Sequence, residues 1–141
     1  MPELQLAPDA PAMPQVLSGV APYLTVQDAG AASELYQRAF AAKEVGRAYA
    51  EDGKRVLHLH LHLNGGSLML MDVFPEYGSA DEPPRGILLH LQVDDINSWF
   101  QRAVDAGLEV KMPPAMMFWG DLYAQAQDRF GVLWSFGQRP G

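Results

Sequence analysis

Residues 23–28 read YLTVQD, and residues 90–95 read HLQVDD. Each stretch places two apolar residues at alternate positions and then ends on an aspartate, a pattern typical of a β-strand that leads into a helix N-cap. A second match follows in the same order, because residues 36–40 (YQRAF) resemble residues 100–104 (FQRAV). A repeat that keeps its order indicates a duplicated structural unit. We therefore expect two similar halves, each beginning with a strand and a helix.

Three further strands complete each half. Turn residues interrupt the apolar alternation, as in the EDGK and NGG stretches at residues 51–54 and 64–66. The expected strands of the first half are 16–26, 43–50, 55–63 and 67–72, and those of the second half are 87–93, 109–112, 121–127 and 132–137. Asp28 is expected to cap the first helix, which extends through Phe40, and Gly107 to end the second. The sequence thus predicts an α+β fold of two βαβββ modules in tandem.

The proline and glycine content sets the predicted boundaries. Prolines at positions 2, 8, 11 and 14 interrupt any periodicity in residues 1–15, which we interpret as a mobile N-terminal arm. The modules are expected at residues 16–74 and 86–138, with a linker at 75–85, inside one domain that spans residues 16–138.

Composition excludes several classes of partner and chemistry. The chain has 141 residues and a formal net charge of -7, without a run of lysine or arginine, so no nucleic-acid or anionic membrane surface is expected. Cysteine is absent, which excludes disulfides and thiolate metal sites. No apolar run approaches about 18 residues and no targeting stretch is visible, so we expect a cytoplasmic protein without a membrane partner.

Residues 55–63 read RVLHLHLHL and place three histidines, His58, His60 and His62, on one side of one strand. The leucines that alternate with them occupy the other side, which is expected to pack against the helix. For His60 and His62 the favoured interpretation is a solvated sheet face. Metal binding at this strand needs a third ligand, and Asp72, Glu44 and Glu51 are candidates by residue type only.

The same alternation assigns faces in the second half. Leu89, Leu91 and Val93 are expected to face the helix, and Leu88, His90 and Gln92 to lie opposite. In the last strand, Trp134 and Phe136 are expected on one face, and Leu133, Ser135 and Gly137 on the other. Residues 116–123 (MMFWGDLY) are rich in methionine and aromatic side chains, which suit either an apolar wall for a ligand or filling of the core. Sequence alone leaves both interpretations open.

The duplicated unit resembles the glyoxalase/bleomycin-resistance/dioxygenase superfamily, also called vicinal oxygen chelate proteins, and within it the PhnB-like branch. The resemblance rests on residues 22–26, 36–40, 89–95, 112–114, 117–121 and 128–135. It implies curled mixed sheets that form a cleft between the modules, and a homodimer. In the metal enzymes of the family, the ligand positions correspond to Ala21, Leu88 and Ser135 of this chain, so no resident metal or other cofactor is expected.

Three hypotheses for function follow from the resemblance and the residues. The first is a metal-independent cleft that binds a small organic molecule and acts on it as a lyase or isomerase, with His90 or His58 as general acid or base. The residues expected to position the substrate are Tyr23, Gln92, Trp119, Tyr123 and Ser135. The second is a resistance-type protein that sequesters a drug or metabolite without catalysis. The third is a metal enzyme whose ligands come from His58, His60 and His90.

Overall fold

A computed structural model describes residues 5–9, 11–78 and 82–141. In the predicted arm at residues 1–15, residues 1–4 and 10 lie outside the described part of the chain. In the predicted linker at residues 75–85, residues 79–81 lie outside it. The chain divides into two compact units, one of Met1–Gln37 with Ala41–Glu82, the other of Arg38–Phe40 with Pro83–Gly141. Each unit is built around a four-stranded sheet.

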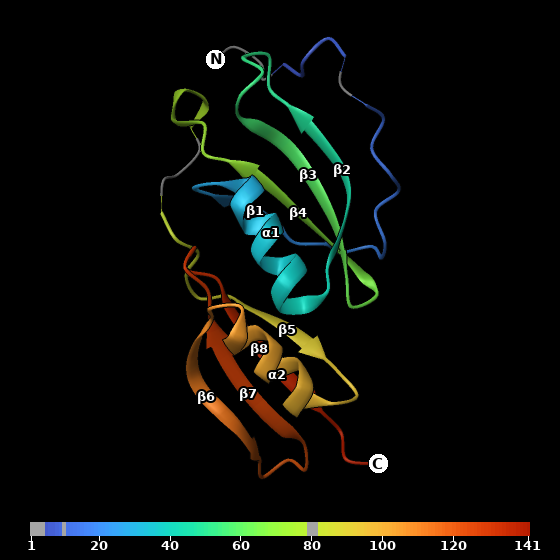
Figure 1. The fold of residues 1–141 in the computed structure, drawn as a ribbon, viewed down its shortest axis with the longest axis vertical. Helices are drawn as coiled ribbons and strands as arrows, with labels where there is room; N and C mark the ends of the chain where they lie inside the picture. Colours follow the sequence, from blue (N-terminus) through green and yellow to red (C-terminus); the bar gives the residue numbers. More distant parts are fainter. Residues whose placement is uncertain (1–4, 10, 79–81) are drawn as a thin grey trace. The chain divides into compact units, whose positions relative to one another are not determined.

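The first unit follows the order strand, helix and three strands (Figure 1). Its elements are β1 (Tyr23–Val26), α1 (Ala29–Phe40), β2 (Lys43–Tyr49), β3 (Val56–Leu63), β4 (Gly66–Asp72) and the short 3-10 helix η1 (Pro75–Tyr77). The strands are ordered β1-β4-β3-β2, with β1 parallel to β4 and the other pairs antiparallel.

The second unit repeats this topology. Its elements are β5 (Leu88–Gln92), α2 (Ile96–Asp105), β6 (Glu109–Met116), β7 (Leu122–Gln127) and β8 (Leu133–Gln138). The order is β5-β8-β7-β6, again with one parallel pair, β5 with β8. The predicted α+β fold of two βαβββ modules is confirmed. In the described residues, no helix is long and apolar enough to cross a membrane.

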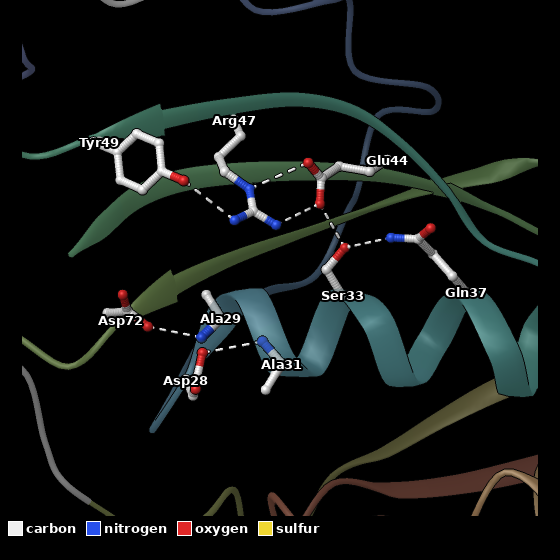
Figure 2. A network of polar contacts seen from close by, with 9 residues as sticks. All are labelled: Asp28, Ala29, Ala31, Ser33, Gln37, Glu44, Arg47, Tyr49 and Asp72. Atoms are coloured by element: carbon white, nitrogen blue, oxygen red, sulfur yellow. Dashed lines mark hydrogen bonds and ion pairs between the residues drawn. The ribbon is translucent and has the colours of Figure 1, made fainter. Parts of the chain in front are cut away.

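Aspartates fix where the helices begin. The carboxylate of Asp28 accepts a hydrogen bond of 3.0 Å from the amide of Ala31, as an N-cap does. Asp72, at the end of β4, accepts from the amide of Ala29 at 2.7 Å (Figure 2). Its other carboxylate oxygen accepts from the amide of Val56 at 2.6 Å. One carboxylate therefore ties the start of α1 to the start of β3.

The end of α2 depends on Gly107, as predicted. This residue has a φ of 111°, which is accessible to glycine at little cost. Its amide donates to the carbonyl of Val104 at 3.0 Å, and the amide of Leu108 donates to that of Ala103 at 3.1 Å. This pair of bonds is the Schellman arrangement, which satisfies the last carbonyls of the helix.

Each helix covers one face of its own sheet, and the alternation of the strands predicted which face. Leu59, Leu61 and Leu63 of β3 are buried, together with Leu91 and Val93 of the second half. In the second unit, Phe100 of α2 packs on Phe136 of β8 with ring centroids 5.4 Å apart. The helix side of each sheet is therefore the hydrophobic core, and the opposite side, called here the helix-free face, is left for other contacts.

The helix-free face of the first sheet is covered by part of the predicted arm and by residues expected to form a strand. Residues 16–22 are not a strand; the amide of Leu17 instead donates to the hydroxyl of Ser67 at 2.8 Å. Met13 packs directly against Gly46, because a Cβ added at Gly46 would lie only 2.8 Å from the Met13 sulfur. His60 is consequently 0% exposed, so the interpretation of His60 as a solvated residue was wrong.

Candidate functional site

The helix-free face of the second unit brings together most of the predicted site residues. The parallel register places His90 beside Ser135 and Gln92 beside Gly137. The antiparallel register of β7 and β8 extends these two rows to Gln125 and Tyr123. Because neighbouring strands lie about 4.8 Å apart, side chains within one row are in contact range.

His90 is held by hydrogen bonds at both ring nitrogens. Its Nε2 lies 2.9 Å from Oε1 of Gln92, and its Nδ1 lies 2.7 Å from the hydroxyl of Ser135. An amide oxygen can only accept, so Nε2 carries the proton when the ring is neutral. Nδ1 then accepts from the Ser135 hydroxyl, whose residue is only 2% exposed. The three side chains thus form one oriented chain, from Ser135 through His90 to Gln92.

Gly137 leaves the space in which this chain lies. A Cβ at Gly137 would be 2.8 Å from Oε1 of Gln92 and 2.9 Å from Nε2 of His90. Side chains do not approach a Cβ so closely, so the imidazole can lie flat over β8 only because the residue is glycine. The alternation of residues 133–137 also predicts that Gly137 lies on this face, but no sequence signal indicates its role.

Tyr123 borders the imidazole on the next strand. The two rings are nearly parallel, at 12°, with centroids 6.2 Å apart. The amide of Gln125 donates to the Tyr123 hydroxyl at 3.0 Å, which fixes the phenol in this orientation. Gln125 was missed in the sequence, although the alternation of residues 122–127 places it on the same face as Tyr123.

The aromatic segment beside Tyr123 is largely exposed. The Trp119 ring meets the Tyr123 ring edge-on at 5.8 Å and the Phe118 ring at 4.9 Å. Phe118 is 95% exposed, and Trp119 is 50% exposed. Neither ring is therefore buried in the hydrophobic core of the second unit.

Tyr23 and His58 form a separate pair, on the helix-free face of the first unit. The Tyr23 hydroxyl lies 2.8 Å from Nδ1 of His58 and 3.1 Å from the carbonyl oxygen of Leu57. Burial lowers the pKa of His58 and raises the pKa of Tyr23. The predicted site residues thus fall into two sets, Tyr23 and His58 in one unit, and His90, Gln92, Trp119, Tyr123 and Ser135 in the other.

Two of the three carboxylates suggested as a third metal ligand for the histidine strand are engaged elsewhere. Glu44 receives hydrogen bonds from Arg47 at 2.9 Å and from the Ser33 hydroxyl at 2.7 Å (Figure 2). Burial raises the pKa of Glu44, but the bonds from Arg47 and Ser33 together lower it below its usual range. Asp72 accepts from two backbone amides at the start of α1 and β3. Within the described part of the chain, no three residues of the types His, Cys, Asp and Glu are grouped to hold a metal ion.

The residues at the family's ligand positions do not fit a divalent metal either. Ala21 and Leu88 have hydrocarbon side chains without a donor atom. Ser135 is buried, and its hydroxyl contacts His90. These three side chains therefore do not provide a ligand set for a divalent metal.

Comparison with known proteins agrees with the fold. The family model for the Glyoxalase/Bleomycin resistance protein/Dioxygenase superfamily matches residues 15–136. The uncharacterized protein Mb0911c of Mycobacterium bovis is 38% identical over 125 residues, which cover 84% of this chain and 82% of that protein.

Solved structures are similar across nearly the same span. TioX from Micromonospora sp. ML1 superimposes with a TM-score of 0.68 at 21% identity, covering 87% of this chain and 99% of that chain. The PhnB protein from Bacillus cereus gives a TM-score of 0.65 at 16% identity, covering 86% and 99%. The expected resemblance, including a PhnB neighbour, is confirmed. The chain belongs to the glyoxalase/bleomycin resistance protein/dioxygenase superfamily.

Proposed function

We propose that this protein binds a small organic molecule on the helix-free face of the second unit. The observation that carries the proposal is the hydrogen-bonded set of Ser135, His90 and Gln92, beside the ring of Tyr123 and the exposed ring of Trp119. Small-molecule sites combine apolar and aromatic walls with a few oriented polar groups. These side chains supply both on one surface.

The geometry favours binding over base catalysis at His90. Both of its ring nitrogens are already hydrogen-bonded, so a ligand can transfer a proton directly to His90 only after one of these bonds breaks. The groups on this face that a ligand can contact are the hydroxyl of Tyr123 and the aromatic rings, beside the side chain of Gln92. Such a surface suits a planar molecule that carries hydrogen-bond acceptors. We therefore place sequestration or delivery of a small molecule ahead of lyase or isomerase chemistry at this face.

The experiment is a fragment screen by two-dimensional NMR on the wild-type protein, with binding constants measured for the hits by calorimetry. We expect planar polar fragments to shift the signals of β5, β8 and β7. Gln92→Ala is expected to weaken the hits at least tenfold, about 1.4 kcal/mol.

Gln101→Ala is the matched control, because Gln101 is an exposed glutamine whose amide donates to Asp105 on α2, and it is expected to leave binding unchanged. Fragments that bind equally well to the Gln92→Ala variant would contradict the proposal.

We also propose that the working form is a homodimer. The exposed apolar side chains of Met116, Phe118 and Trp119 support this, since monomers seldom expose several large apolar groups together. The third hypothesis from the sequence is a metal enzyme with displaced ligands. Among the described residues, no cluster of three potential metal ligands favours it.

A further inference from the structure

The two units carry tyrosine and histidine at matching positions, with the residue types exchanged. In the first unit, Tyr23 on β1 contacts His58 on β3. In the second unit, His90 on β5 contacts Tyr123 on β7. The registers make the positions equivalent, because β1 pairs with β4 as β5 pairs with β8, and β3 and β7 occupy the next place in each sheet.

The hydrogen bonds of the two histidines differ. His90 uses both ring nitrogens, as described above. His58 uses Nδ1 for Tyr23, and within the described residues its Nε2 makes no hydrogen bond. His58 is partly exposed, and its Nε2 is not among the buried polar atoms that lack a partner. This nitrogen is therefore open to a ligand.

The contacts of Tyr23 favour one position for the proton of His58. A phenol has one proton to donate, and a backbone carbonyl can only accept. With its proton directed to the Leu57 carbonyl at 3.1 Å, the Tyr23 oxygen must accept from His58 at 2.8 Å. The proton then resides on Nδ1, and Nε2 presents a lone pair. This assignment satisfies all three polar groups at once.

The surroundings keep His58 in the neutral form that this assignment needs. Burial lowers the pKa of His58, so the ring is neutral near pH 7. Burial also raises the pKa of Tyr23, which keeps its proton. On the same strand, the His60 ring lies edge-on to the His58 ring, with the two centroids 6.2 Å apart.

We propose that Tyr23 is a positioning residue that holds His58 in the Nδ1–H tautomer, which makes Nε2 of His58 the proton acceptor for a ligand with a weakly acidic O–H or N–H group. In the transfer, the ligand's O–H or N–H bond breaks and an Nε2–H bond forms, while the electron pair stays on the ligand. The positive charge of the imidazolium is then stabilised by the Nδ1–H bond to Tyr23. The inference concerns the first unit and does not rest on the function proposed for the second.

The test is the tautomer of His58 in the full-length protein, measured from the imidazole ¹⁵N shifts at a pH where the ring is neutral. We expect a protonated Nδ1 and an unprotonated Nε2 in the wild type. Tyr23→Phe is expected to shift the population toward the Nε2–H form. Tyr49→Phe is the matched control, because the Tyr49 hydroxyl on β2 accepts from Arg47 and does not contact His58.

The outcomes are decisive in both directions. An Nε2–H tautomer in the wild type overturns the proposal, even if the Tyr23→Phe variant fails to fold. A folded Tyr23→Phe variant with an unchanged Nδ1–H tautomer overturns the role of Tyr23.

A second readout is the rate at which diethyl pyrocarbonate modifies His58, mapped by mass spectrometry. The lone pair of Nε2 attacks a carbonyl carbon of the reagent and an N–C bond forms, while ethyl carbonate leaves. We expect His58 to react several-fold faster than the buried His60 and to slow several-fold in Tyr23→Phe. Equal rates for the two histidines would contradict an open Nε2.

Discussion

Replacing Gly137 by alanine tests the packing on which the His90 network depends. The new Cβ would lie 2.8 Å from Oε1 of Gln92 and 2.8 Å from Cε1 of His90, well inside the usual contact distance. Both side chains are exposed and can rotate away without opening the core. The rotation removes the bond to Ser135, and an unsatisfied buried hydroxyl costs about 1–3 kcal/mol. We therefore expect Gly137→Ala to lower the free energy of unfolding by about 1–3 kcal/mol and to weaken ligand binding at least tenfold.

Urea denaturation followed by tryptophan fluorescence measures the first effect, and calorimetry with a fragment hit measures the second. Gly66→Ala is the matched control, because Gly66 also lies in a strand and its added Cβ would meet only the carbonyl oxygen of Leu63, at 3.7 Å. We expect that variant to retain binding. A Gly137→Ala variant that keeps both wild-type stability and wild-type ¹⁵N shifts for His90 would refute this role of Gly137.

Further predictions concern the core, the pH response and assembly. Asp128 accepts from two backbone amides and from Nε1 of Trp134 at 2.9 Å, so Asp128→Asn should cost about 2 kcal/mol in urea denaturation. Burial and then the two neighbouring histidines lower the pKa of His60 below 6.5. As the pH falls through about 6.5, the unfolded chain takes up a proton at His60 that the folded chain does not, so the free energy of unfolding should fall. In the His60→Gln variant, the free energy of unfolding should depend less steeply on pH in this range. Phe118→Ser should lower the dimer fraction in light scattering, and an unchanged mass would count against a contact there.

The fold was largely predictable because its signals are local. The alternation in β3 determines which side of the strand is apolar, and the burial of Leu59 and Leu61 follows from it. The aspartate caps and Gly107 mark the helix ends by chemistry that acts within a few residues. The burial of His60 could not be predicted, since it depends on residues 13–17 crossing the far face of the sheet, a contact between segments distant in sequence.

The candidate site was predictable only as a set of residues on common faces. Alternation placed His90, Gln92 and Ser135 on one side of their sheet, but their hydrogen bonds depend on the register of β5 against β8. The importance of Gly137 arises from the same register, which puts it directly beside Gln92. The tautomer of His58 depends on the Leu57 carbonyl, a backbone group whose direction a sequence pattern does not specify.

The measurement that bears most directly on the proposed function is a structure of the protein with a bound fragment from the NMR screen. We predict that the fragment lies on the helix-free face of the second unit, in contact with Gln92 and Tyr123 and beside Trp119. A fragment that binds with its highest affinity away from β5, β8 and β7, and whose binding is unaffected by Gly137→Ala, would contradict the account.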